Sequence, residues 1–400
     1  MSSNKVTVSL TLLAAFFIFP FTLTQARVRS GADRILENPY LDWIQGKRVG
    51  LITNPTGVNS QLVSTWEVLA QHPEVEVVAL FGPEHGVFGQ AQAGDRISDY
   101  GTVYSLYGDT RAPTAEMLEN VEALIYDIQD VGVRFYTYIS TMYLSMQAAA
   151  KKGIPFIVLD RPVPIDGARV EGPVLLTGHE SFVGLPGLPI RYGMTTGELA
   201  RMLNQEKRLE TNLKVVPLDD WNRRHWYDQT SLEWILPSPN MPTLTTATVY
   251  PGFGLIEGTN LSEGRGTTLP FELVGAPWLN GRELARRLNR LQLSGVRFRP
   301  QTFAPTFSKF QDQPCQGIQI HILDRNTFQP LNIALRLLTE VRRLHPEQLE
   351  FNDTFFDRLA GNSWIREALS EGRPVEEIVN RWQGELDKFK EKRKKYLLYE

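Results

Sequence analysis

The sequence predicts an α/β protein, in which a Rossmann-like, doubly wound parallel sheet is followed by a smaller C-terminal α/β auxiliary domain. Apolar runs rich in Val, Ile and Leu alternate with segments of helical spacing through the first half of the chain. This alternation is typical of parallel strands covered by helices on both faces. Three of the runs end abruptly in charged residues, at Glu84, Asp127 and Asp160. Because ligands of open α/β sheets bind at the carboxyl ends of the strands, the sequence also predicts a polar pocket there.

Strands and helices are expected in regular alternation from residue 47 to residue 218. We expect strands over 47–53, 75–81, 121–128, 154–160 and 213–218, and helices over 64–73, 141–153 and 195–208. Ser64 is a helix start signal, and Gly153 is a C-cap signal. Thr195 and Glu198 have the spacing of a capping box. The polar stretch over 82–107 is predicted to be one long functional loop.

The second half of the chain changes character twice. From about 221 to 278 it is dense in Pro, Gly, Thr, Asn and aromatic residues, which indicates loops that build a site. After residue 279 we expect helices over 281–291 and 331–345, strands over 296–305 and 315–324, and two further helices. The predicted organisation is a Rossmann-like catalytic domain over 27–245, a site-building loop region over 246–278 and an auxiliary α/β domain over 279–400.

The N-terminus has the pattern of a secretory signal peptide over 1–26. Lys5 precedes an apolar stretch over 6–23, and Thr-Gln-Ala at 24–26 supplies a small-x-Ala ending. The stretch is too short and too interrupted for a membrane span. We therefore expect export to the periplasm or the extracellular space, with no stable membrane span once the signal is removed. A retained anchor is the alternative.

Composition narrows the class of partner. The formal net charge of −3 gives no indication of nucleic-acid binding. The basic stretch over 388–395 contains Glu391 and is predicted to be the solvated face of a last helix. The single cysteine, Cys315, cannot form an internal disulfide, and we expect it to be a buried small hydrophobe.

Glu84 and His85 are the first candidate catalytic pair. They follow a predicted strand and are flanked by Gly82-Pro83 and Gly86, so the backbone around them is rigid. Partial burial raises the pKa of a carboxyl group, which is what a general acid needs, so Glu84 is a candidate for that role. The alternative is a surface glutamate that caps a helix.

A second group of candidates follows the next two strands. Asp127 and Asp130 could share acid and base work, and Tyr136 lies nearby. Arg134 could hold a substrate carboxylate in a bidentate fork, and Arg161 could act as a binding clamp. The alternative for all these charges is internal ion pairing.

The densest polar cluster lies in the predicted loop region, at Glu257, Asn260, Glu263, Arg265 and Thr267. Glycines punctuate it, so its backbone can approach a ligand closely. Hydrogen-bonding side chains of this kind, with aromatic rings nearby, favour a sugar-binding loop, although the aromatic residues could equally belong to the core.

Other chemistries lack their sequence patterns. No G-x-G-x-x-G follows the first strand, no H-E-x-x-H or paired histidine spacing occurs, and no G-x-S-x-G is present. We therefore expect no nucleotide cofactor and no metal. What remains is carboxylate chemistry in a sugar-sized cleft, which is the glycosidase pattern.

Long motifs resemble those of the exo-β-N-acetylmuramidase (NamZ) family from about residue 47 to the end of the chain. They are GLITNPTGV, FGPEHGVFG, YSLYG, YDIQDVGVRFYTYISTM, LDRPVPIDG, VEGPVL, LPIRYGMTTGELA, SPNMPT, YPGFGLIEGTNLSEGRGTTLPFELVGAPW and CQGIQI. The resemblance implies a Rossmann-like domain and an auxiliary domain with the substrate cleft between them. It also implies a catalytic glutamate, which Glu84 matches, whereas Glu257 and Glu263 are candidates for a second role. Asn240 lies in one of these motifs, and Val163 stands where the family pattern has Asn.

Two functions of different classes follow. The first is an exo-acting β-N-acetylmuramidase that removes N-acetylmuramic acid from the non-reducing end of peptidoglycan fragments. Arg134 or Arg191 would then bind the lactyl carboxylate, and a muropeptide or disaccharide would be the substrate. The second is a non-catalytic muropeptide-binding protein of the cell envelope. A metal-dependent or phosphoryl-transfer hydrolase on the same fold is a third, weaker option.

Overall fold

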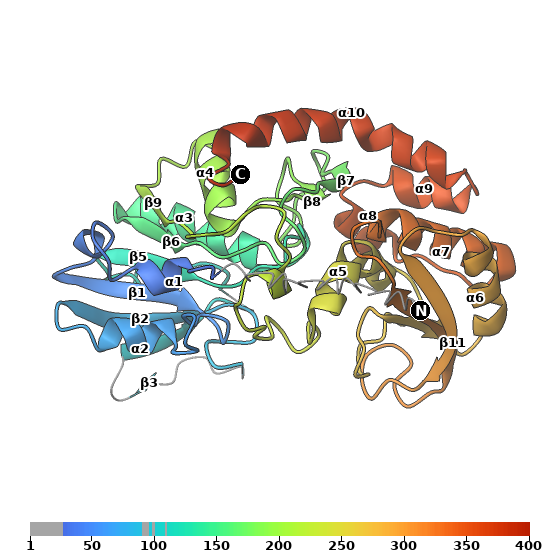
Figure 1. Cartoon of the computed structure of the whole chain (residues 1–400), viewed down its shortest axis with the longest axis horizontal. Helices are drawn as coiled ribbons and strands as arrows, with labels where there is room; N and C mark the ends of the chain where they lie inside the picture. Colours follow the sequence, from blue (N-terminus) through green and yellow to red (C-terminus); the bar gives the residue numbers. More distant parts are fainter. Residues whose placement is uncertain (1–26, 90–95, 98–100, 109) are drawn as a thin grey trace, which may run out of the picture.

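The computed structural model describes residues 27–89, 96–97, 101–108 and 110–400. They form two lobes side by side, with one long helix running across the top of both (Figure 1). The predicted signal peptide over 1–26 lies outside the described residues. Within the described part of the chain, no helix is long and apolar enough to cross a lipid bilayer.

The first lobe is built on a seven-stranded sheet in the order β3-β4-β2-β1-β5-β6-β9. Six strands run parallel, and the short β3 is antiparallel to β4. The strands are β1 (Lys47–Thr53), β2 (Val75–Gly82), β3 (Arg96–Ile97), β4 (Gly101–Ser105), β5 (Ala123–Asp127), β6 (Phe156–Leu159) and β9 (Leu213–Val216). The predicted parallel α/β sheet is confirmed.

Helices cover both faces of this sheet, so the doubly wound prediction also holds. They are α1 (Gly31–Arg34), η1 (Leu41–Trp43), α2 (Thr65–Ala70), α3 (Tyr138–Lys152), α4 (Thr196–Glu206) and η2 (Tyr227–Gln229). Side chains alternate between two cores along each strand: Ile125 packs with residues of α1 and α2, whereas Leu124 and Tyr126 pack with residues of α3 and α4. This period-two alternation within uniformly apolar strands is the signature of a sheet buried on both faces.

The local start and stop signals act as predicted. Ser64 and Thr195 each form a capping box with the glutamate three residues later. Gly153 ends α3 in the left-handed conformation at φ 76°. One expectation was wrong: the stretch over 82–107 is not a single loop, because β4 lies within it and pairs with β2. The β-branched and aromatic residues of β4 are stabilised by pairing with β2, and this pairing exists only in the assembled sheet.

The second lobe carries a three-stranded antiparallel sheet in the order β10-β12-β11, with helices packed on it. Its elements are α5 (Leu244–Phe253), η3 (Gly254–Gly258), β10 (Leu273–Ala276), α6 (Gly281–Arg290), β11 (Val296–Phe303), β12 (Cys315–Ile322), α7 (Pro330–Leu344), α8 (Asp353–Ala360) and α9 (Trp364–Ser370). A two-stranded ribbon of β7 (Glu171–Val174) and β8 (Pro189–Arg191) lies near the junction of the lobes. Cys315 is buried, as expected.

The region over 246–278, expected to be mostly loop, is more regular than predicted. It holds most of α5, all of η3 and the edge strand β10. Pro251 lies inside α5, and residues 246–253 are all buried. A helix that is buried on every side has no amphipathic period, so its sequence gives no helical signal.

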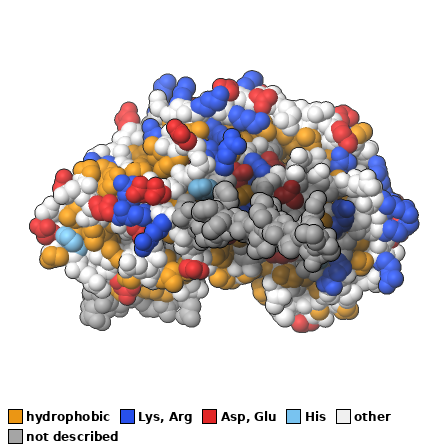
Figure 2. All heavy atoms as spheres, in the orientation of Figure 1, with side chains coloured by type: hydrophobic (Ala, Val, Ile, Leu, Met, Phe, Trp, Pro, Cys, Tyr) orange, Lys and Arg blue, Asp and Glu red, His pale blue; other side chains and the backbone are white. Residues whose placement is uncertain are grey.

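The long helix α10 (Val375–Arg393) and η4 (Lys394–Tyr396) return the chain from the second lobe to the first (Figure 1). Lys and Arg side chains gather along the top edge there, over the C-terminal half of α10 (Figure 2). The predicted solvated basic face is present, with one exception. Arg393 is buried and donates to the carbonyls of Gly167 at 3.1 Å and Ala168 at 2.8 Å. It thereby fastens the helix to the first lobe.

Candidate active site

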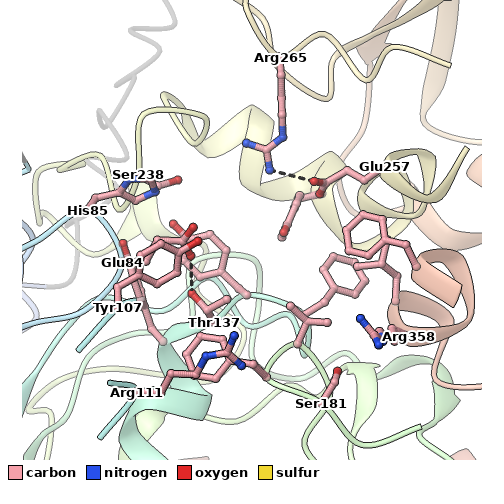
Figure 3. Close-up of a pocket in the computed structure, with 18 of the residues that line it drawn as sticks. Glu84, His85, Tyr107, Arg111, Thr137, Ser181, Ser238, Glu257, Arg265 and Arg358 are labelled. Carbon is pink, nitrogen blue, oxygen red and sulfur yellow. Dashed lines mark hydrogen bonds and ion pairs between the residues drawn. The ribbon is translucent and has the colours of Figure 1, made fainter. Parts of the chain in front are cut away.

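A cavity of about 680 Å³ lies between the lobes, at the carboxyl edge of the parallel sheet (Figure 3). Residues from both lobes line it. They are Glu84, His85, Tyr107, Gly108, Arg111, Phe135, Tyr136, Thr137, Tyr138, Ser181, Phe182, Val183, Ser238, Tyr250, Glu257, Arg265, Phe355, Arg358 and Leu359. Of the residues predicted from sequence, Glu84, His85, Tyr136, Glu257 and Arg265 meet here. The predicted polar pocket at the strand ends is therefore present.

Glu84 reaches the cavity from a tight turn at the end of β2. A Cβ atom on Gly82 would lie 2.6 Å from the backbone nitrogen of Val87, so the chain folds back in a space that only glycine allows. His85 has φ 73°, a left-handed conformation that is uncommon outside glycine. The half-buried Glu84 side chain is thus presented by a constrained backbone.

Thr137 holds the Glu84 carboxylate. Its hydroxyl donates to Glu84 Oε2 at 2.9 Å (Figure 3). Thr137 is the N-cap residue of α3, yet its side chain makes no capping bond, because its hydroxyl is directed to Glu84. On another side, the negative charge of Glu84 raises the pKa of the Tyr107 phenol, which keeps that group protonated. Glu84 therefore has two hydroxyl neighbours that fix its orientation.

Glu257 faces the cavity from η3 in the second lobe. Arg265 Nη2 donates to Glu257 Oε2 at 3.0 Å (Figure 3). Burial raises the pKa of Glu257, and the positive charge of Arg265 opposes that rise. Behind this pair, Glu263 accepts from Lys309 at 3.1 Å and lies 3.5 Å from Arg265. The four side chains form a chain of alternating charge that fixes Glu257 in place.

Tyr136, Tyr138 and Tyr250 line the same cavity as the two carboxylates. The ring of Tyr136 makes edge contacts with Tyr138 at 4.9 Å and with Tyr250 at 5.9 Å. Burial raises the pKa of all three phenols, so each remains a hydrogen-bond donor at neutral pH. Tyr136 lines the cavity together with Ser238, whose hydroxyl is its hydrogen-bonding neighbour.

Asp127 and Arg161 do not line the cavity; they form a buried ion pair below it. Arg161 donates to both carboxylate oxygens of Asp127, at 2.6 and 2.9 Å, and Thr65 donates to the second oxygen at 2.5 Å. The internal pairing left open by the sequence is what the structure shows. The expectation that these two residues contact substrate is not supported, because each already has its partners.

Arg134 is likewise a structural residue rather than a carboxylate fork. Its side chain is completely buried, and its guanidinium donates to the carbonyls of Pro173 at 2.9 Å, Leu188 at 2.8 Å and Leu359 at 2.7 Å. Burial lowers the pKa of Arg134 to about 9. It therefore ties the β7–β8 region to the end of α8, and it has no surface to offer a substrate.

Arg191 is also occupied within the protein. Its guanidinium pairs with Glu171 at 2.5 Å and donates to the carbonyl of Ile165. Both arginines first proposed for the lactyl carboxylate are therefore placed outside the cavity, so that assignment needs correction.

The remaining predicted residues support the loops around the site. Asn260 donates to the carbonyl of Gln348 at 2.7 Å, and Thr267 donates to the carbonyl of Gly264 at 2.6 Å. Asn240 is half-buried and does not line the cavity. Glu263 lies behind Arg265, as described above, so its contribution is through its neighbours.

Several lining residues were not identified from the sequence. Thr137 is a residue type typical of an N-cap, and that signal could have placed it beside the start of α3. Arg111 and Arg358 lie in unremarkable polar segments and reach the cavity only through tertiary folding. Among the described residues, no group of three or more His, Cys, Asp and Glu side chains could hold a metal ion.

Comparison with known proteins agrees with this architecture. The exo-β-N-acetylmuramidase NamZ family models match with their N-terminal part at residues 49–245 and their C-terminal part at residues 248–399. The peptidoglycan β-N-acetylmuramidase NamZ of Bacillus subtilis (strain 168) is 50% identical over 385 residues, which are 94% of this chain and 93% of that protein.

Two crystal structures of DUF1343 family proteins from Bacteroides fragilis NCTC 9343 share the fold. The first has a TM-score of 0.88 and 42% identity and covers 94% of this chain and 100% of its own. The second has a TM-score of 0.76 and 31% identity and covers 93% of this chain and 99% of its own. Because the two family models match one after the other and together span almost the whole chain, this chain belongs to the NamZ exo-β-N-acetylmuramidase family.

Proposed function

We propose that this chain is an exo-acting β-N-acetylmuramidase, a glycoside hydrolase that removes N-acetylmuramic acid from the non-reducing end of peptidoglycan fragments. The observation that carries the proposal is the pair Glu84 and Glu257, presented to one cavity from opposite lobes in a chain of this family. Two carboxyl groups that flank a sugar-sized space are what glycoside hydrolysis requires.

Glu84 is the proposed general acid. It protonates the glycosidic oxygen as the bond to the anomeric carbon breaks, and the leaving sugar departs as an alcohol. The bond from Thr137 fixes the carboxyl toward the reacting atoms. Later in the cycle the same group, now a base, accepts a proton from the attacking water.

Glu257 is the proposed second carboxylate, which stabilises the positive charge that develops at the anomeric carbon. Glu257 lines the cavity, whereas Glu263 is 2% exposed and paired with Lys309, so the choice between these two candidates favours Glu257. Arg265 helps to keep Glu257 ionised despite its burial.

The test is release of para-nitrophenol from para-nitrophenyl β-N-acetylmuramide. Glu84→Gln should lower kcat by about 100-fold or more, the usual contribution of a general acid. Glu119→Gln, an exposed glutamate on the same lobe, is the matched control and should retain activity. Full activity in Glu84→Gln would refute the assignment. Products from longer glycan fragments should contain N-acetylmuramic acid alone, released from one end, since internal cleavage would argue against exo action.

We also propose that the protein is exported to the periplasm or the extracellular space. The support is the sequence pattern over 1–26, a positive residue followed by an apolar stretch and a small-x-Ala ending. Intact-mass measurement of the protein from envelope and culture fractions should show a chain that begins at Arg27. A full-length chain confined to the cytoplasm would contradict this proposal.

A further inference from the structure

Three arginines line the cavity in the described part of the chain, and two of them have no carboxylate partner there. Arg265 is neutralised by Glu257 and Glu263. Arg111 and Arg358 form no ion pair with any described residue. Unpaired guanidinium groups at a cavity wall favour an anionic ligand group.

Arg358 lies on α8 in the second lobe, and its own helix offers it no counter-charge. The nearby carboxylates of Asp353 and Asp357 are both taken by Arg366, at 3.2 and 2.8 Å. Figure 3 shows Arg358 across the cavity from Glu84. Arg358 is an exposed residue that lines the cavity, so it can bind a group inside it.

Arg111, in contrast, lies on the side of the general acid. Its guanidinium is 4.7 Å from the ring centroid of Phe182. Its positive charge lowers the pKa of the Tyr107 phenol, whereas the charge of Glu84 raises it, so all three groups are neighbours. Arg111 thus lies close to where the glycosidic oxygen must be protonated.

The shape of the sugar decides between the two arginines. Glu84 must lie beside C1, so the far edge of the pyranose ring, which carries O3 and O4, points away from Glu84. Muramic acid differs from glucosamine only in the lactyl group on O3, whose carboxylate extends that far edge. We propose that Arg358 binds this lactyl carboxylate and thereby determines the selectivity for muramic acid; the inference rests on the function proposed above.

The supporting structure around Arg358 is rigid. Arg134 donates to the carbonyl of Leu359, the next residue along the chain. A Cβ atom on Gly258, in η3, would lie 2.6 Å from the Cα of Phe356, so α8 packs tightly on the segment that carries Glu257. The packing of α8 on η3 therefore fixes the position of Arg358 relative to Glu257.

The experiment compares kcat/KM on para-nitrophenyl β-N-acetylmuramide, on its lactamide analogue and on the β-N-acetylglucosaminide. Arg358→Gln should lower the muramide-to-lactamide ratio by about 10- to 100-fold, the effect of one charge-assisted hydrogen-bonded contact. Arg358→Lys should restore part of the ratio. Arg290→Gln, an exposed arginine of the same lobe, is the matched control and should keep the wild-type ratio.

The outcomes separate this inference from the proposed function. A ratio in Arg358→Gln within twofold of wild type, or a loss seen in Arg111→Gln instead, would overturn the assignment. If the wild type cleaves none of the substrates, the proposed enzyme activity fails, and calorimetric binding of N-acetylmuramic acid and N-acetylglucosamine then tests Arg358 by itself. Preferential binding of the acid that disappears in Arg358→Gln supports the assignment, and equal or absent binding overturns it.

Discussion

Replacing Arg134 with leucine tests the claim that this residue joins parts of the fold rather than binding substrate. The change removes three N–H donors whose acceptors are the carbonyls of Pro173, Leu188 and Leu359. It also removes a fully buried charge whose pKa is lowered by burial, so part of the loss is offset by relief of desolvation.

The magnitude follows from the same contacts. Each buried carbonyl left without its donor costs about 1 kcal/mol or more. The carbonyl of Leu188 keeps a second donor, the backbone N–H of Leu175 at 3.0 Å, so the carbonyls of Pro173 and Leu359 are the two that lose their donor. Together they predict a loss of about 2 to 3 kcal/mol in the free energy of unfolding, and the relief of desolvation leaves a net loss of about 1 to 2 kcal/mol. Leucine also fills less space than arginine, which adds to the cost because the residual void cannot fully close.

Urea unfolding followed by tryptophan fluorescence and by circular dichroism is the assay, with coincident transitions required for a two-state treatment. Arg290→Leu, at an exposed arginine, should change stability by less than about 0.5 kcal/mol. Arg134→Leu should also lower the muramide-to-lactamide selectivity, because its lost bond holds the residue after Arg358. A stability change below about 1 kcal/mol would refute the reasoning.

Three further predictions concern buried polar groups. Tyr399→Phe removes a 2.6 Å hydrogen bond to Asp160 and should cost about 1 to 2 kcal/mol in urea unfolding; an unchanged midpoint would contradict it. Lys309→Met removes the outer cation of the charge chain behind Glu257, so the acid limb of the pH–rate profile should move to higher pH; an unmoved limb would show that the chain does not act on Glu257. Burial raises the pKa of Asp130 to about 6 and of Asp160 to about 7, above the roughly 3.9 of an unfolded chain. The folded state then holds protons that the unfolded state releases, so these groups should make stability fall as pH rises from about 4 to 7, and Asp130→Asn should flatten the Tm profile over that range.

The site could be predicted only in part from sequence, because sequence shows which charges exist but not which of them pair. Glu84 and Glu257 were identified and do meet in one cavity. From the sequence, Arg134, Asp127 and Arg161 were equally good candidates for the site. In the structure Asp127 and Arg161 pair with each other, and Arg134 donates to backbone carbonyls. Whether a charged side chain faces a cavity or a partner depends on neighbours that come from distant segments of the chain.

The fold was more accessible to prediction than the site. Apolar strands, capping boxes and a glycine C-cap are short-range features, and their physical causes lie within a few residues of one another. The sequence therefore determined the parallel sheet, the start of α2, the end of α3, the start of α4, and the edge of the sheet at which the polar residues gather. It missed α5, whose burial on all sides leaves no period, and β4, whose pairing partner is β2.

What only the tertiary structure decided is the composition of the cavity across the two lobes. Arg358 faces Glu84 because α8 packs on η3 and because Arg134 holds the end of α8. Each of these contacts joins segments far apart in the chain, so no local pattern encodes them. By itself the sequence determined which residues have the chemistry for a glycosidase, and the packing of the two lobes determined which of them can reach a sugar.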